Sequence, residues 1–321
     1  MSERKRMLSY STMQIIVVFV VLIGLFGLSS LMSPYFLSSY NMTIIARSLA
    51  FIGLVTLGQA MLMLLGELDL SLGAMGGLCG VVAGMLMVDA GIDPFVALFL
   101  AVLLGAFLGL VNGLLVTGLG LHSLVLTIAT AGMYKGINLV LTKGVAITNI
   151  PETIEFLGRG TVYGVPVPFL IMLTLLAVVG ILVHRMSFGR YIFAIGDNTP
   201  AARMLGIRVN RVRVLVFVIA GTLAALAGVL MVARLGTAQP SIGDTWVLPS
   251  IAAAVIGGVA TTGGIGSPVG AILGAAIIGV IENIIVLYGI SPYWQSVVSG
   301  AIVVVAISFD SVSRRYLLGR E

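Results

Sequence analysis

Apolar runs long enough to cross a bilayer occupy most of this 321-residue chain. A helix rises about 1.5 Å per residue, so crossing a hydrocarbon core of about 30 Å takes roughly 20 apolar residues. Runs of this kind lie at residues 12–33, 42–65, 71–88, 94–117, 123–142, 166–184, 213–233, 247–264, 268–287 and 294–310. Only 9% of the residues are charged, against roughly a quarter in soluble domains, so a water-soluble fold is excluded. The sequence predicts an all-α polytopic membrane protein of about ten transmembrane helices, forming one transmembrane domain over residues 1–321.

The basic residues set the expected orientation. Most of the 17 lysines and arginines lie in three segments, residues 4–6, 185–213 and 314–320. Such clusters mark the cytoplasmic side of a membrane protein. Ten spans place both termini and the 185–213 loop on that same side, so the span count and the charge pattern agree. Acidic residues, Asp244 among them, then fall in loops on the external side. The first run is too long for a signal peptide and lacks an Ala-x-Ala cleavage site, so we expect it to be retained.

Two stretches rich in glycine and proline, around residues 67–77 and 250–270, are predicted to interrupt their helices. Irregular backbone at membrane depth is tolerated only where it is buried in protein or lines a cavity. These stretches are therefore expected to be broken or re-entrant segments. The longest external segment is expected at residues 143–166.

Charged side chains are rare inside the predicted spans, where each costs about 2.5–3.5 kcal/mol at a helix centre. Glu67 and Asp69 are separated by one residue, so a continuous helix would point them to different faces. A break in the helix, with Asp69 or Ser71 starting the next helix as an N-cap, explains the pair more simply. Two interpretations stay open: a cap near the cytoplasmic interface, and a place in the lining of a solute path.

Lys135 lies well inside the fifth span, where it either snorkels or pairs with an interior acid such as Glu282. Asn112 and Asn283 are suited to hydrogen bonds between helices, which is the commoner role of asparagine in a membrane. The candidates for a translocation path are Glu67, Asp69, Asn112, Lys135, Glu282 and Asn283.

The composition excludes several classes of function. Each of the three lysines, Lys5, Lys135 and Lys143, is followed by a residue other than Ser or Thr, so the chain has no Walker A loop for ATP. The single Cys79 excludes a disulfide framework, and the two histidines lie far apart, so no metal site is expected. The net charge of +5 comes from the clustered basic loops and is not a nucleic-acid signal. We expect no catalytic residue, no enzymatic activity and no cofactor on this chain.

The polar segment 185–213 is the longest interruption of the apolar sequence, with six arginines and one acid. Asp197 or Asn198 is suited to cap the start of a helix, the alanines that follow favour helix, and Gly206 is suited to end it. A structured cytoplasmic loop of this kind indicates that a partner docks there. The alternative is a basic loop that binds anionic membrane lipid.

Four stretches, in order along the chain, carry a resemblance to a known family. They are Asp69-Leu70-Ser71-Leu72-Gly73; Gly189-Arg190-Tyr191 with Ala194-Ile195-Gly196-Asp197-Asn198, Ala201-Ala202-Arg203 and Gly206-Ile207; Ala233-Arg234-Leu235 with Ala238-Gln239-Pro240; and Ile251-Ala252-Ala253 with Gly257-Gly258, Gly263-Gly264 and Gly266. Together they resemble the ribose permease family, the membrane permease subunits of bacterial ABC importers for monosaccharides.

The resemblance implies a multi-pass protein of the bacterial inner membrane that works with a second permease protomer. It also implies an ABC ATP-binding subunit on the cytoplasmic side and a periplasmic sugar-binding protein on the other. In such permeases a short cytoplasmic helix, here about residues 199–205, seats in a groove of the ATPase. The residues carried over to this coupling role are Gly196, Asp197, Asn198, Ala201, Ala202, Arg203 and Gly206.

The chain departs from the family pattern in three places. Val247-Leu248-Pro249 stands where members often have Glu-Leu-Asp, Glu282-Asn283 stands where many have two asparagines, and Glu67 replaces a frequent glycine. Some members pair with a second, different permease, so both a homodimer and a heterodimer are considered.

The sequence thus predicts the transmembrane subunit of an ATP-driven importer that moves a monosaccharide or small polyol by alternating access. The alternatives are a branched-chain amino-acid permease of related architecture and a secondary transporter driven by protons through Glu67, Asp69 and Glu282. A structural membrane scaffold is disfavoured by the polar residues inside the spans.

Overall fold

The computed structural model describes residues 3–291, 294–295, 297–302, 304–305 and 308. Seven helices of this described part are long and apolar enough to cross a bilayer: α1 (Glu3–Met32), α2 (Ser39–Leu64), α4 (Pro94–Leu119), α5 (Ser123–Thr142), α7 (Val167–His184), α10 (Val209–Leu235) and α12 (Pro268–Leu287). Two apolar helices are shorter, α3 (Leu72–Val88) and α11 (Val247–Ile256). The predicted all-α polytopic membrane fold is confirmed. The tenth predicted span and the basic residues 314–320 fall partly or wholly outside the described residues.

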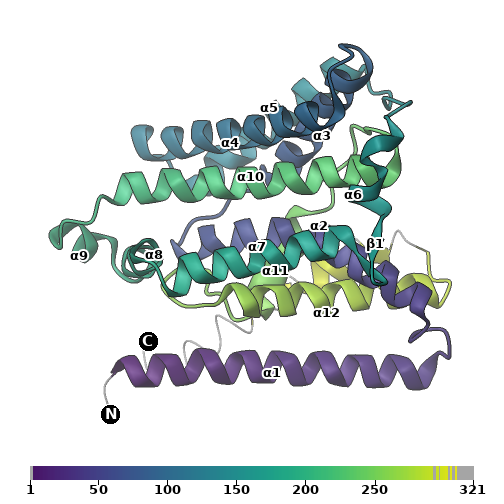
Figure 1. Cartoon of the computed structure of the whole chain (residues 1–321). Coiled ribbons are helices and arrows are strands. Elements are labelled where there is room, and N and C mark those ends of the chain that lie inside the picture. The colour runs from purple at the N-terminus through teal and green to yellow at the C-terminus, as the bar shows by residue number, and fades with distance from the viewer. Residues whose placement is uncertain (1–2, 292–293, 296, 303, 306–307, 309–321) are drawn as a thin grey trace.

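The remaining elements lie at the two ends of the bundle (Figure 1). The short helices α8 (Ser187–Asp197) and α9 (Thr199–Met204) lie at the same end as the start of α1, and we call this the α9 end. The opposite end, the α6 end, carries η1 (Glu152–Ile154), α6 (Glu155–Arg159) and an antiparallel hairpin of β1 (Thr161–Val162) and β2 (Val165–Pro166). The predicted loops 185–213 and 143–166 thus lie at opposite ends of the molecule.

The two predicted helix interruptions differ in extent from the expectation. The first is confined to residues 65–71, and α3 is regular from Leu72 onward despite its glycines. The second is larger: the predicted span 247–264 is wrong in length, because α11 ends at Ile256. Four glycines after that point adopt positive φ, between +75° and +144°, a region that residues with a Cβ rarely adopt: Gly258, Gly263, Gly264 and Gly266. The helix therefore stops well before the apolar run does.

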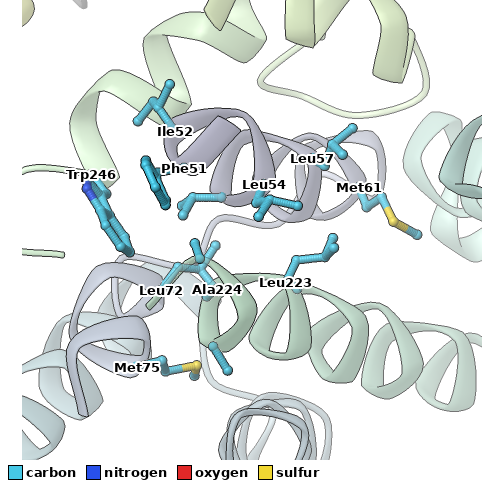
Figure 2. Close-up of a cluster of buried hydrophobic side chains, with 14 of the residues drawn as sticks. Phe51, Ile52, Leu54, Leu57, Met61, Leu72, Met75, Leu223, Ala224 and Trp246 are labelled. Atoms are coloured by element: carbon cyan, nitrogen blue, oxygen red, sulfur yellow. The ribbon is translucent and has the colours of Figure 1, made fainter. Parts of the chain in front are cut away.

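Helices α2 and α10 form the centre of the bundle, and α10 packs mainly against α4, α3 and α2. Figure 2 shows the core where they meet, with Phe51 and Leu57 of α2 on one side and Leu72 of α3 and Leu223 of α10 on the other, and the indole of Trp246 beside Phe51. Because lipid tails are as apolar as these side chains, the helices associate through close packing and not through a hydrophobic driving force.

Glycines permit that close packing. A Cβ built on Gly228 of α10 would lie 1.9 Å from the carbonyl oxygen of Gly76 in α3, and one on Gly221 would lie 2.4 Å from that of Gly105 in α4. Backbones that approach so closely leave no room for any side chain, as in other glycine-mediated membrane helix pairs. These glycines are therefore required where α10 crosses α3 and α4.

Replacing Gly228 by alanine is expected to push α10 away from α3 and to lower the melting temperature. The cost of overpacking a core is typically about 1–3 kcal/mol. Gly180→Ala in α7 is the matched control, since no atom lies within 4 Å of its built Cβ. Alanine favours helix, so this control is expected to melt at or slightly above the wild-type temperature in detergent. Equal melting temperatures for the two variants would contradict the packing described.

Candidate functional site

One face of α5 is polar along the whole length of the helix. Every buried residue of α5 is a hydroxyl or amide residue, and they are Ser123, Thr127, Thr130, Tyr134, Asn138 and Thr142. Their spacing of three or four residues places them on one side of the helix. We call this set the α5 polar face. Inside a membrane protein such a face needs polar partners, which are found in two irregular segments of the chain.

The first partner is the break segment, residues 65–71, between α2 and α3. The backbone N–H of Leu68 donates to Oγ of Ser123 at 3.2 Å, and that of Leu70 donates to Oγ1 of Thr127 at 3.0 Å. These N–H groups have no helical partner, so the hydroxyls of α5 satisfy donors that lipid cannot satisfy. The α5 polar face is therefore what permits the break.

The second partner is the return segment, residues 236–246, which follows α10. It folds back along α3: Cβ atoms built on Gly77 and Gly73 would lie 2.2 Å from the carbonyl oxygens of Ile242 and Gly243. The carbonyl oxygen of Pro240 accepts from Nδ2 of Asn138 at 3.2 Å. The return segment thus passes through the bundle from the α6 end, although its sequence was read as an external loop.

Asp69 is the centre of a buried hydrogen-bond cluster within the break segment. Its side chain is inaccessible, and Oδ1 accepts from the backbone N–H and the hydroxyl of Ser71 at 2.7 and 2.6 Å. Nδ2 of Asn112 in α4 donates to Oδ2 of Asp69 at 3.2 Å and to Oγ of Ser71 at 2.9 Å. The phenolic hydroxyl of Tyr134 donates to Oδ1 of Asn112 at 2.9 Å. Ser71 is the N-cap residue of α3, but its side chain makes no cap bond, and Asp69 accepts from Ser71 before the helix begins. The expected side-chain cap of α3 is therefore not formed.

Glu67, in the same break segment, has a different partner from Asp69. Oε1 of Glu67 lies 3.0 Å from Nε of Arg213, in the second turn of α10, and the two side chains are 10% and 21% exposed. The contact is an ion pair by distance, but Nε of Arg213 is not aligned for a hydrogen bond and has no other partner. Because α10 starts at the α9 end, Glu67 belongs to that half of the bundle.

Lys135 pairs with Asp244 and not with Glu282, the interior acid that the sequence analysis offered as one alternative. Nζ of Lys135 lies 2.6 Å from Oδ1 of Asp244 and donates to the carbonyl oxygen of Pro240 at 2.8 Å. The reason is the return segment, which brings Asp244 beside α5, where its side chain remains 44% exposed. The glycines of α3 that face this segment, Gly73 and Gly77, were the available signal.

The two candidates in α12 lie in a third place. Asn283 and Asn41 of α2 each donate to the other's side-chain oxygen, at 2.8 and 3.0 Å. This confirms that Asn283 joins two helices by hydrogen bonds, as does Asn112. Glu282 is half-buried and has no ion-pair partner among the described residues. Of the six path candidates, only Asp69 and Asn112 come together in one cluster.

The loop between α7 and α10 contains the predicted short helix. Oδ1 of Asn198 accepts from the N–H of Ala201 at 3.0 Å and so caps the start of α9. At the other end Gly206 has φ +79°, with bonds from its N–H to the Arg203 oxygen and from the N–H of Ile207 to the Ala202 oxygen. These two bonds and the left-handed residue make a Schellman cap. The helix predicted near 199–205 is confirmed at Thr199–Met204.

The exposed tip of α9 includes two apolar residues that the sequence analysis missed. Ala202 is buried, whereas Met204 and Leu205 are 89% and 80% exposed. Arg203 and Arg208 beside them are also exposed. The signal in the sequence was a pair of large apolar residues directly before the glycine cap. The apolar tip, with Arg203 and Arg208 beside it, thus projects from the α9 end on a helix that is capped at both ends.

A bundle of apolar helices with buried irregular segments and a capped helix projecting from one end is the architecture of a multi-pass transport protein. The model of the family described as branched-chain amino acid transport system / permease component matches residues 41–307, and the chain belongs to this family. Together with its membrane-spanning helices, this makes it a multi-pass protein of the bacterial inner membrane.

Relatives along nearly the whole chain are import permeases. The ribose import permease protein of Bacillus subtilis (strain 168) is 39% identical over 312 residues, 96% of each chain. That of Haemophilus influenzae is 34% identical over 297 residues, covering 91% of this chain and 92% of the relative. The autoinducer 2 import system permease protein of Yersinia enterocolitica is 33% identical over 292 residues, 91% and 81% of the two chains. No solved structure matches this chain.

Asn112→Leu is expected to destabilise the Asp69 cluster most, because it removes a donor to a buried carboxylate and the acceptor of Tyr134. An unsatisfied buried group costs about 1–3 kcal/mol, whereas Tyr134→Phe loses one hydrogen bond, worth about 0.5–1.5 kcal/mol. The control is Thr117→Ala on the same helix, whose hydroxyl bonds only within α4. Unfolding in detergent should rank the losses of stability in that order, and a Thr117 variant as unstable as the Asn112 variant would refute it.

Proposed function

We propose that this chain is the transmembrane subunit of an ATP-driven importer that moves a monosaccharide or related small polyol across the inner membrane by alternating access. The observation that carries the proposal is the tip of α9, where Met204 and Leu205 are almost fully exposed beside arginines. The sequence has no Walker A loop, so an ATP-driven importer built on this chain takes its energy from a separate ATPase subunit. The ribose and autoinducer 2 permeases among its relatives support an importer of small polar solutes.

The α9 end is assigned to the cytoplasm, because the six arginines of residues 185–213 lie there. An ABC ATP-binding subunit docks on α9, with Met204 and Leu205 entering an apolar groove and Arg203 contacting its rim. Two of the coupling residues set the bounds of α9: Asn198 caps its start, and Gly206 ends it. ATP hydrolysis takes place on that separate subunit.

A second permease protomer packs against the outward face of α5. Gly132 and Gly136 are exposed and have no atom within 4 Å of a built Cβ, so this face has room for another helix. Lys135 and Asp244 beside them are 31% and 44% exposed. Lipid solvates an ion pair poorly, so a charged pair on a membrane helix faces either protein or a water-filled path. We therefore place the translocation path along α5 between two protomers, with Lys135 on this protomer's side. Asp69 and Asn112 lie behind α5, on its buried side.

At the opposite end of the bundle, α6 and the β hairpin form the surface to which a periplasmic sugar-binding protein delivers the solute. This surface is anchored to the helices: a guanidinium N–H of Arg47 donates to the carbonyl oxygen of Arg159, and Nε of Arg159 donates to that of Arg234. Recognition of the sugar then rests mainly with the binding protein, and the polar groups of the permease provide a path.

The proposal is tested by purifying the tagged chain from its native membrane in mild detergent and identifying the proteins that accompany it. An ATPase subunit is expected to co-purify with the wild-type chain. It is expected to be lost when residues 197–203 are replaced by a Gly/Ser linker. An intact, monodisperse chain that brings no ATPase would contradict the proposal.

Arg203→Glu and Leu205→Glu are each expected to reduce ATPase co-purification and ATP-driven uptake at least tenfold, a loss of about 1.4 kcal/mol or more in docking. Both side chains are exposed, so the variants are expected to melt at the wild-type temperature. Lys143→Glu, a charge reversal at the α6 end, is the control for ATPase docking and should retain ATPase co-purification. Full ATPase binding by Leu205→Glu would exclude the tip of α9 as the docking site.

Gly136→Leu is expected to prevent the second protomer from packing while leaving the single chain folded, since its side chain enters open space. Chemical cross-linking in native membranes should then show monomer in place of dimer. Gly27→Leu in α1 also enters open space and serves as the control. A cross-linked dimer that persists unchanged in the Gly136 variant would place the interface elsewhere.

A further inference from the structure

The break segment lies against the last turn of α8 and against α10, the elements that precede and follow α9, and, on its other side, against the α5 polar face. From this arrangement we infer that the break segment transmits movement of α9 to the polar cluster around Asp69. Gly196, Glu67 and Arg213 are then positioning residues for transport, although none of them touches the ATPase or the solute. The inference rests on the proposed docking of an ATPase at α9.

The first contact lies where α8 ends. A Cβ built on Gly196 would lie 2.0 Å from the carbonyl oxygen of Leu64 and 2.5 Å from the amide nitrogen of Gly264. The N–H of Gly264 donates to that same Leu64 oxygen at 3.0 Å, and a Cβ on Gly263 would lie 2.8 Å from the amide nitrogen of Gly66. The backbone of three chain segments, around residues 64–66, 196 and 263–264, thus meets with no side chain in between. A displacement of α8 must move the start of the break segment, because backbone in direct contact has no compliant side chain to absorb it.

The second contact lies where the loop leaves α9 and enters α10. Arg213 is seven residues beyond the Gly206 cap and forms the ion pair with Glu67, in the middle of the break segment. Both side chains are largely withdrawn from solvent, so their attraction is stronger than that of a surface pair. The break segment is thus attached to the element before α9 and to the element after it.

The third set of contacts joins the break segment to α5 and α4. Leu68 and Leu70 are bonded through their backbone N–H groups to Ser123 and Thr127 of α5. Asp69, between them, holds Asn112 of α4, and Asn112 in turn accepts from Tyr134 of α5. A shift of the break segment therefore requires α5 to follow or these bonds to be exchanged. Since α5 bears the proposed protomer interface and Lys135, this route leads from α9 to the proposed path.

A charge swap tests the electrostatic contact. Glu67→Arg, Arg213→Glu and the double variant would be reconstituted in proteoliposomes with the ATPase subunit and the binding protein. The measured quantity is D-ribose transported per ATP hydrolysed. Each single variant is expected to lower this ratio at least fivefold, the lower range of a coupling between sites, while the ATPase still co-purifies. The double variant is expected to recover most of the ratio, which a simple loss of folding would not do. Glu67→Gln provides the same test if a charge reversal prevents folding.

A steric variant tests the backbone contact independently. Gly196→Ala is expected to lower the transport ratio with the ATPase still bound, because its methyl group meets the backbone of Leu64 and Gly264. Gly118→Ala in the last turn of α4 meets no atom within 4 Å and should behave as wild type. Wild-type ratios in Gly196→Ala and in both single charge variants would overturn the inference alone. A wild-type chain that binds no ATPase would overturn the proposed function and this inference together.

Discussion

The structure depends on one requirement: backbone that leaves helical geometry inside a membrane must find its hydrogen-bond partners within the protein. The α5 polar face meets this requirement for both irregular segments. Hydroxyls at Ser123 and Thr127 receive the N–H groups of the break segment, and Asn138 donates to the return segment. A helix whose buried side is entirely polar would be unstable alone in lipid. Here the hydrogen bonds between α5 and the break and return segments stabilise both the helix and the segments.

The irregular segments bring charged groups to places where no continuous helix would put them. The break segment holds Asp69 within its cluster and Glu67 beside Arg213, and the return segment delivers Asp244 to Lys135. Glycines make room for this backbone, since the contacts of α3 with the return segment admit no side chain. Transport by alternating access needs elements that change position while keeping their polar groups satisfied. Segments held by exchangeable side-chain bonds meet that need better than packed helices do.

Hydropathy alone predicted the long spans, because crossing a bilayer is a requirement on each segment taken separately. It did not predict that α11 ends at Ile256, inside an apolar run. The caps of α9 were predictable, since Asn198 and Gly206 act on residues a few positions away. The partner of Lys135 was not, because Asp244 lies 109 residues further along the chain, in a segment that reads as a loop. The regular spacing of polar residues in α5 and the glycines of α3 were visible in the sequence. Their contacts were not, because those contacts depend on where the break and return segments fold.

The central claim is that ATP hydrolysis on a partner drives uptake of a sugar through this chain. The most direct measurement is uptake of labelled D-ribose by proteoliposomes that contain the chain and its ATPase, with ATP at the α9 side and the binding protein at the α6 side. Ribose is expected to accumulate only when ATP is present, and an uncoupler should have no effect. Uptake without ATP that collapses with an uncoupler would contradict the claim in favour of a proton-driven transporter. ATP-driven uptake of leucine and not of ribose would assign the chain to amino-acid import.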